Sequence, residues 1–180
     1  MQRFFNRAAP GWDDRTRAGS VDHLTPLAAA VTKVAATPER VLDIGTGTGE
    51  GALFLAREFP RAGVRGVDLS DEMIRAARSK VGLDPDGRIA FRVADAARLP
   101  YEDESFDLVA QLNMPPFFAE IARVLRPHGT AVVAASWGDT TPFYTPPAML
   151  ERGFRRAGMT DFDQGVAGAG TWFVARKSAE

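Results

Sequence analysis

A short loop with three alternating glycines limits what this chain can fold into more than any other feature. It lies in the stretch VLDIGTGTGEGA, residues 41–52, where Gly45, Gly47 and Gly49 follow a short apolar run. Glycine lets the backbone turn sharply and lets a ligand approach it, because no Cβ is in the way. A helix beginning at Glu50 would present its free N–H groups there, and such a terminus favours an anion. An ordinary tight turn is the alternative, but the stretch favours a strand, a ligand-binding loop and a helix.

Apolar runs typical of strands alternate along the chain with segments typical of helices. The expected strands cover residues 40–44, 64–69, 89–94, 106–112, 130–136, 159–163 and 171–176. The expected helices cover residues 21–36, 50–59, 70–81, 116–125 and 146–157, with Asp22 as the N-cap of the first and Gly158 capping the last. This alternation predicts an α/β fold with a doubly wound, mostly parallel, seven-stranded sheet. Only a glycine-rich piece, residues 165–170, separates the last two strands, so an antiparallel C-terminal hairpin is expected at one edge.

Composition removes several classes of function. The chain has 180 residues, no cysteine, two histidines and a net charge of −1. Cysteine nucleophiles and thiolate zinc sites are therefore excluded, and no histidine or carboxylate cluster has the spacing of a metal site. Lys and Arg are scattered, so no nucleic-acid-binding patch is visible. No apolar segment is long enough for a signal peptide or a membrane span. We expect a single cytoplasmic domain without nucleic-acid or membrane partners.

An acidic residue at the end of the second expected strand points to a nucleotide. Asp68 lies about 20 residues beyond the glycines, where a carboxylate can accept hydrogen bonds from both ribose hydroxyls. A helix-capping role is the alternative, but Ser70 and Asp71 already serve as the cap. The loop alone does not choose the nucleotide, because residues 47–52 also fit the dinucleotide pattern G-x-G-x-x-A. Asp43 and Gly45 before that pattern argue against a dinucleotide, and the charge of Asp68 disfavours NADP.

The loop also resembles a known family motif. Residues 43–49, DIGTGTG, are similar to the first motif of class I S-adenosylmethionine (SAM)-dependent methyltransferases, an acidic residue followed by G-x-G-x-G. The similarity continues at the later strand ends and covers nearly the whole chain. Residues 5–14, FNRAAPGWDD, resemble the opening of the methyltransferases of ubiquinone and menaquinone synthesis. The resemblance implies a Rossmann-like fold, SAM as cofactor, a small-molecule methyl acceptor, and an N-terminal helical cap over residues 1–37.

The resemblance also implies which residues hold the cofactor. Asp68 would hold the ribose, and the adenine would lie near Asp95. The whole implied set is Asp43, Gly45, Thr46, Gly47, Gly49, Asp68, Leu69, Met73, Asp95, Ala96, Gln111 and Asn113. Two members have plain alternatives: for Asp43 the alternative is a purely structural role in ordering the loop, and for Asp95 it is a solvent-facing turn residue.

Apolar and aromatic residues follow the fourth and fifth expected strands and recur near the N-terminus. We expect Trp12, Met114, Phe117, Trp137 and Tyr144 to bind the acceptor. None is basic, so an acidic polymer would be poorly held, and a small, partly aromatic or aliphatic acceptor is expected. The same residues could instead form a core or a homodimer interface.

No residue stands out as a catalytic group. Methyl transfer from a sulfonium can proceed by alignment and exclusion of water, and a base is needed only if the acceptor must lose a proton. His23 and Asp139 are candidate bases, with capping or surface roles as alternatives, and His128 is expected to be structural. Two other functions stay open. One is a noncatalytic SAM-binding module. The other is an NAD-dependent oxidoreductase, although the chain lacks an obvious Tyr-Lys or His arrangement for it.

Overall fold

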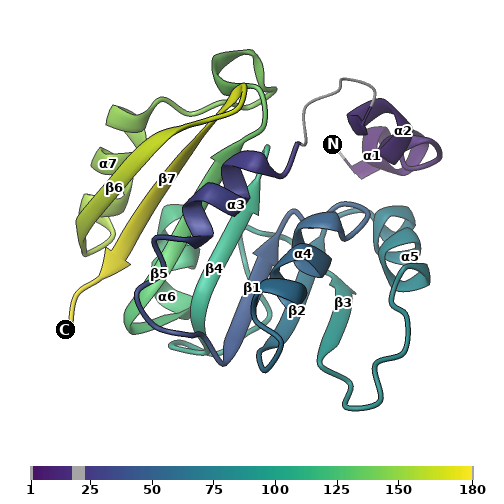
Figure 1. Ribbon diagram of the computed structural model, residues 1–180, viewed down its shortest axis with the longest axis horizontal. Helices are drawn as coiled ribbons and strands as arrows, with labels where there is room; N and C mark the ends of the chain where they lie inside the picture. Colours follow the sequence, from purple (N-terminus) through teal and green to yellow (C-terminus); the bar gives the residue numbers. More distant parts are fainter. Residues whose placement is uncertain (1, 18–22, 180) are drawn as a thin grey trace.

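A seven-stranded sheet with helices on both faces forms the centre of the molecule (Figure 1). The computed structural model describes residues 2–17 and 23–179. The strands are β1 (Arg40–Ile44), β2 (Gly63–Asp68), β3 (Ile89–Val93), β4 (Phe106–Leu112), β5 (Leu125–Ala135), β6 (Met159–Ala167) and β7 (Gly170–Lys177). Their order is β3-β2-β1-β4-β5-β7-β6; β1 to β5 pair in parallel, and β7 is antiparallel to both its neighbours. The expected doubly wound α/β fold is confirmed.

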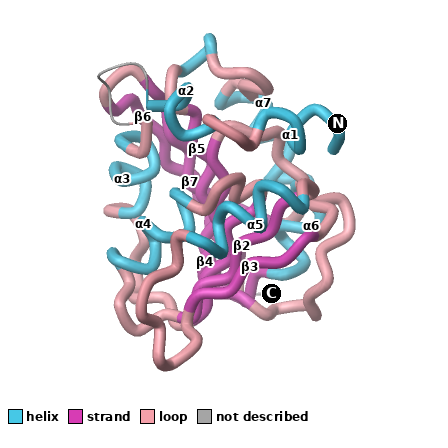
Figure 2. The backbone as a smooth tube through the Cα atoms, turned by 90° about the vertical axis from the view of Figure 1, so that its right-hand side faces the viewer, coloured by secondary structure: helices cyan, strands magenta, loops and turns pink. Residues whose placement is uncertain are grey.

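Two apolar cores lie on opposite faces of this sheet. One face is covered by α3 (Thr25–Val31), α4 (Glu50–Glu58) and α5 (Asp71–Ser79), which bury Leu27, Leu55 and Ile74 against the strands. The other is covered by α6 (Phe118–Val124) and α7 (Pro147–Arg156), which bury Ile121, Leu150 and Phe154. Burial of these side chains is the main force that holds helices to a sheet. Figure 2 shows the same layers from the side.

Several element boundaries differ from those expected. The first long helix is shorter, since α3 covers only Thr25–Val31, and its expected N-cap, Asp22, lies outside the described residues. Helix α6 begins at Phe118 rather than Pro116. Strand β5 begins at Leu125, directly after α6, and includes Pro127, His128 and Gly129, which were expected to separate helix from strand.

The C-terminal hairpin is longer than expected. Strand β6 continues to Ala167, through part of the glycine-rich piece that was expected to be a connection. Gly165 fits the strand because the indole of Trp172 lies beside it, where a Cβ would come within 2.6 Å of Cζ2. Gly158 ends α7 with a φ of +87°, as the expected cap requires.

The carboxyl ends of the parallel strands meet at one edge of the sheet, and the strand order reverses there between β1 and β4. Ligands of open α/β sheets bind outside this edge, at the point of reversal. The short helices α1 (Gln2–Ala8) and α2 (Trp12–Arg17) lie beyond this edge, above α5 in Figure 1. Within residues 2–17 and 23–179, no helix is both long and apolar enough to cross a membrane.

Candidate cofactor-binding site

The glycine loop joins β1 to α4 at the reversal point of the sheet. Gly45, Gly47 and Gly49 have φ values of +68°, +53° and +87°, a region that side chains strongly disfavour. Gly49 also lies against α5 and β3, where a Cβ would be 2.9 Å from atoms of Ala77 and Phe91. The backbone conformation therefore favours glycine at all three positions, and close packing also excludes a side chain at Gly45 and Gly49.

Asp43 orders this loop from below. Its side chain is 2% exposed, and its Oδ2 accepts a hydrogen bond of 2.6 Å from the Thr46 hydroxyl. The backbone N–H of Ala52 also donates to the carboxylate. Burial raises the pKa of Asp43 to about 7, against the lowering effect of these bonds. Its contacts are those of a residue that orders the loop and the first turn of α4.

Asp68, at the end of β2, faces the same loop. One carboxylate oxygen accepts from the Gly47 N–H and the other from the Ser70 N–H, both at 2.9 Å. Burial raises the pKa of Asp68, and its backbone hydrogen bonds oppose that rise. Each carboxylate oxygen has a further lone pair, so the group can also accept from ligand hydroxyls. The expected ribose-binding carboxylate thus lies within one hydrogen bond of the glycine loop.

Apolar side chains are exposed at the ends of β2 and β3. Leu69 is 37% exposed and Val93 is 45% exposed, whereas Met73, in the helix that follows β2, is buried. Asp95 is exposed and accepts a hydrogen bond from the Ala97 N–H at 2.9 Å, and Ala96 is half-buried. An apolar surface next to a carboxylate is suited to a flat, partly polar ring such as adenine.

Across the reversal point, Gln111 carries an unsatisfied acceptor. The residue is the last but one of β4, is paired with Ile44 and is 1% exposed. Its Nε2 donates to the Met114 carbonyl at 3.1 Å, but within the described part of the chain its Oε1 has no hydrogen-bond partner. A buried polar atom without a partner is destabilising, so such atoms are uncommon in folded proteins. Here it lies where a ligand donor could satisfy it.

Asn113 has a structural role at the same edge. It adopts a φ of +59° and exchanges two hydrogen bonds of 2.8 Å with Ser136, through its Nδ2 and its Oδ1. Met114 follows and packs on the loop, because a Cβ at Gly45 would overlap its sulfur. The ends of β4 and β5 are therefore tied together next to the glycines.

The N-terminal segment covers the loop through polar contacts. Asn6 accepts from the Ser70 hydroxyl at 2.5 Å and donates to Asp71 at 2.9 Å. Asp13 accepts from the Thr48 hydroxyl at 2.5 Å and pairs with Lys80, whose Nζ lies 2.6 Å from Oδ2. The indole Nε1 of Trp12 lies 3.9 Å from the position that a Cβ at Gly47 would take. Trp12, expected to bind the acceptor, thus lies beside the glycine loop.

The two candidate bases, His23 and Asp139, and the structural His128 lie in different places. His23 Nε2 is 2.8 Å from Glu50 Oε2, and this hydrogen bond lowers the pKa of Glu50. The His23 carbonyl accepts from the Ser136 hydroxyl at 2.8 Å, so the residue spans from α4 to the end of β5. His128 is exposed near the start of β5, away from the site as expected, and Asp139 is exposed in the 3₁₀ turn Gly138–Thr140.

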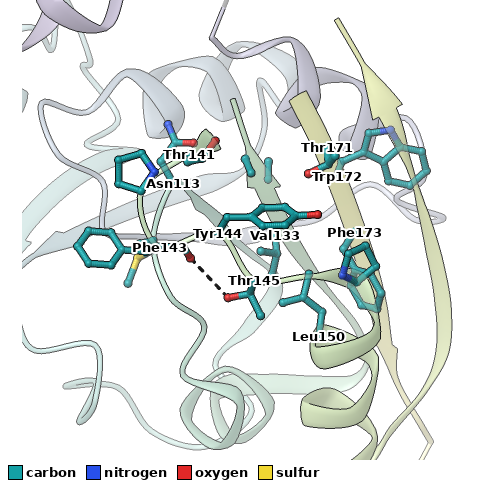
Figure 3. A pocket seen from close by; sticks show the side chains of 15 residues that line it. Asn113, Val133, Thr141, Phe143, Tyr144, Thr145, Leu150, Thr171, Trp172 and Phe173 are labelled. Atoms are coloured by element: carbon teal, nitrogen blue, oxygen red, sulfur yellow. Dashed lines mark hydrogen bonds between the residues drawn. The ribbon is translucent and has the colours of Figure 1, made fainter. Parts of the chain in front are cut away.

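A small cavity adjoins this edge on the β5 and β7 side (Figure 3). Its volume of about 20 Å³ is room for a single water molecule. The lining includes Met114 and Tyr144, which were expected to bind the acceptor, but not Trp12, Phe117 or Trp137. None of its fifteen lining residues is charged.

Sequence reasoning missed Thr145, Thr171 and Trp172, which also line the cavity. Thr171 and Trp172 reach it because β7 pairs directly with β5, so that Trp172 lies opposite Ala134. The sequence contains no signal for this pairing beyond the hairpin itself. Within the described residues, no group of three or more His, Asp or Glu side chains could hold a metal ion.

Known proteins that are similar in sequence to this chain are named as methyltransferases. A family model described as a methyltransferase domain matches residues 41–129, from β1 through the start of β5. A demethylmenaquinone methyltransferase of Deinococcus radiodurans is 37% identical over 142 residues, which cover 74% of this chain and 58% of that protein. The chain belongs to the class I SAM-dependent methyltransferase family. The recognition of this family from the glycine loop is confirmed.

Other members of the class I methyltransferase family agree with this assignment. The ubiquinone/menaquinone biosynthesis C-methyltransferase UbiE of Syntrophotalea carbinolica is 37% identical over 147 residues, 77% of this chain and 62% of that protein. The chain thus spans about three fifths of the length of these two curated relatives. A solved SAM-dependent methyltransferase of Thermotoga maritima shares the fold with a TM-score of 0.74 at 19% identity, covering 99% of this chain and all of that one.

Proposed function

We propose that this protein binds SAM at the carboxyl edge of its sheet and transfers the methyl group to a small-molecule acceptor. The observation that carries the proposal is the convergence of three features at the reversal point. These are the glycine loop, the Asp68 carboxylate one hydrogen bond away from it, and the unpartnered Oε1 of Gln111 across from it. The family to which the chain belongs and the names of its relatives support the same activity.

The residues present fit SAM in polarity as well as position. Asp68 would accept from the ribose hydroxyls, and Gln111 Oε1 would accept from the amino group. The backbone N–H groups where the glycine loop enters α4 would face the carboxylate. The exposed apolar surface of Leu69 would lie against the adenine, with Asp95 at its edge. The amino group of SAM, a donor, would therefore meet an acceptor, and its carboxylate, an acceptor, would meet donors.

When bound, SAM would supply an electrophilic methyl group: the acceptor would form the new bond to the methyl carbon, and the pair of the broken C–S bond would stay on the sulfur, leaving neutral S-adenosylhomocysteine. The chain's own part would be to align the reactants and to keep water out. The N-terminal segment suits the second task, since Asn6, Trp12 and Asp13 hold it across the loop and the start of α5. We therefore propose that the cap expected over residues 1–37 acts mainly through α1 and α2.

The acceptor would be uncharged and largely apolar. The cavity beside Met114 and Tyr144 supports this, because its lining combines aromatic and aliphatic side chains with Thr and Asn. With room for only one water, the cavity would have to widen. Phe143, which is half exposed, is a part of its wall that could move outward. Names of relatives that act on demethylmenaquinone agree with an apolar acceptor.

A thermal-shift screen with SAM, S-adenosylhomocysteine, NAD and NADP tests the proposed cofactor. A ligand that binds only the folded state raises the melting temperature. We expect the first two ligands to raise it and the two dinucleotides to leave it unchanged. A shift with NAD alone would contradict the proposal and favour an oxidoreductase.

Three further expectations stay predictions. A cytoplasmic location can be checked by cell fractionation, and a homodimer by size-exclusion chromatography with light scattering. The absence of a nucleic-acid partner can be checked by titrating labelled RNA and DNA against the protein. A noncatalytic SAM-binding module would bind SAM yet fail to turn over any acceptor of a wide panel.

A further inference from the structure

One part of the sheet lacks the helical cover that a parallel sheet normally has on both faces. The connection from β3 to β4, residues 94–105, consists of turns and contains no helix. On the face that carries α6 and α7, only this connection covers the outer strands β2 and β3: Val67 is buried in a cluster with Leu99, whereas Ala90 and Arg92 stay exposed and form an open part of this face. Ala90, on that face of β3, is exposed although it lies in the middle of the strand.

Arginines from three neighbouring strands occupy this open face. Arg65 of β2 is paired in register with Leu42 and Ala90, and Arg92 of β3 lies two residues beyond Ala90. Side chains two apart in a strand share a face, so Arg40, at the start of β1, and Arg92 lie on the same side as Arg65. Ala90, which lies opposite Arg65 and two residues before Arg92, has only a methyl group on this face.

Aromatic rings of the β3–β4 connection and of β4 lie among these arginines. The Arg92 guanidinium lies 5.9 Å from the ring centre of Tyr101, and that of Arg40 lies 5.4 Å from the ring centre of Phe106. The two rings pack edge to face at 4.9 Å. Burial raises the pKa of the Tyr101 hydroxyl, and the charges of Arg92, Arg65 and Arg40 oppose that rise. All three charges therefore act on this one oxygen.

Among the residues that the structure describes, these groups lack carboxylate partners, although Arg65 Nη1 donates to the backbone carbonyls of Val64 at 3.0 Å and Arg88 at 2.8 Å. Across the described residues, Arg40, Arg65 and Arg92 form no ion pair with a carboxylate, and the buried Tyr101 hydroxyl has no hydrogen-bond partner. The nearby carboxylates are already engaged. Asp107 binds Arg126 and the backbone N–H groups of residues 39 and 40, and Asp84 binds those of residues 88 and 89.

We propose that Arg65, Arg92 and Tyr101 form a binding site for a phosphate group on the open face of β2 and β3, apart from the cofactor site. Guanidinium groups present paired N–H donors that match the oxygens of a phosphate, and they bind it more strongly than neutral donors do. A phosphate oxygen would also give the Tyr101 hydroxyl the acceptor that it lacks. Arg40 adds charge from the neighbouring strand.

Isothermal titration calorimetry on the full chain at low ionic strength, without SAM, tests this site independently of the proposed function. The probes are inorganic pyrophosphate and glycerol 3-phosphate, which separate a diphosphate from a phosphate monoester. We expect saturable binding of at least one probe at one site. Arg92→Gln should weaken it by about tenfold or more, as expected for a lost charge-assisted hydrogen bond.

Two more variants make the test specific. Tyr101→Phe should weaken binding while leaving the melting temperature unchanged, because the hydroxyl it removes has no partner in the free protein. Arg57→Gln, at an exposed arginine of α4 outside the site, is the matched control and should bind the probe as wild type does. Absence of saturable binding, or equal losses in Arg57→Gln and Arg92→Gln, would overturn the proposal.

Discussion

Asp68 is the residue on which the proposed cofactor site depends most. Removing its carboxylate in Asp68→Ala would remove two charge-assisted hydrogen bonds to the ribose, each typically worth about 1.5–3 kcal/mol. We expect SAM affinity to fall by roughly a hundredfold or more, with a smaller loss in Asp68→Asn. Calorimetry with SAM measures both.

The matched control is Asp86→Ala, at an exposed turn residue far along the chain from the loop. It should bind SAM normally. If Asp68→Ala binds SAM as tightly as this control does, the ribose does not lie at the end of β2.

A substitution at Gly47 tests whether the loop lies in close contact with the ligand. Gly47→Val places a branched side chain where φ is +53° and where the only neighbour within 4 Å is Trp12. We expect the variant to remain folded by circular dichroism and to lose SAM binding. Gly82→Val, at an exposed glycine with open space around it, is the control. Normal SAM affinity in folded Gly47→Val would show that the ligand does not pass over this loop.

The raised pKa of Asp43 predicts how the stability of the folded protein depends on pH. Its pKa is about 7 in the folded protein and 3.8 ordinarily, so the folded state holds a proton that the unfolded state has released between these values. The free energy of unfolding should therefore fall as pH rises from 4 to 7, by up to about 1.4 kcal/mol per pH unit from this group. The burial of Asp68 raises its pKa and contributes in the same direction.

Asp43→Asn stays neutral throughout this range and should flatten the decline. Urea unfolding at several pH values between 4 and 8 measures the effect. Equal slopes in wild type and Asp43→Asn would mean that the buried carboxyl titrates as an exposed one does.

At the residue scale, the sequence could predict positions but not contacts. Asp43, Asp68 and Gln111 were placed correctly at strand ends because apolar runs mark where the strands stop. That Asp68 accepts from the Gly47 N–H depends on the path of the loop, which no local pattern specifies. In the same way, Trp172 rather than Trp137 lines the cavity because of the pairing of β7 with β5.

At the scale of elements, helices α1 and α2 are held by polar contacts rather than by a core. Helix α1 buries none of its residues. Asn6 of α1 bonds to Ser70 and Asp71 at the start of α5. Asp13 of α2 bonds to Thr48 of the loop and to Lys80 at the end of α5. Deleting residues 1–14 should therefore leave the melting temperature nearly unchanged. We expect SAM still to bind, while turnover of a confirmed acceptor is lost because water enters the site.

The milder variant Asn6→Ala removes the contacts with Ser70 and Asp71 alone, and it should lower turnover less than the deletion does. Unchanged turnover after deletion of residues 1–14 would remove the N-terminal segment from the acceptor site. Scintillation counting of methyl transfer from labelled SAM provides the readout.

The existence and type of the main helices and strands could be predicted from the sequence, whereas their first and last residues depended on tertiary contacts. The hydrophobic period and the glycine loop predicted β1 and α4 within a residue. Strand β5 begins earlier than expected because its first residue, Leu125, pairs with Phe106 across an irregularity in β4. Pro127 and His128 lie in the register shift between the pairs Phe106–Leu125 and Leu108–Thr130, so they interrupt the ladder without ending the strand.

For the whole molecule, the alternation of strands and helices predicted a doubly wound sheet with a C-terminal hairpin, and this is what the chain forms. The missing helix between β3 and β4 could be read from the sequence, but the arginine-lined face that it leaves open could not. That face is assembled from three strands that are 25 to 27 residues apart, at Arg40, Arg65 and Arg92. Its composition becomes visible only once the register of the strands is known.

The central claim is that SAM lies at the reversal point of the sheet, and nuclear magnetic resonance tests it most directly. Titration of ¹⁵N-labelled protein with S-adenosylhomocysteine should shift backbone amides in residues 45–49, 68–69, 95–96 and 111–113, saturating at one ligand per chain. Amides on the far ends of the same strands should be unaffected. Absence of shifts with this ligand and with SAM, or shifts that lie outside these four segments, would contradict the account.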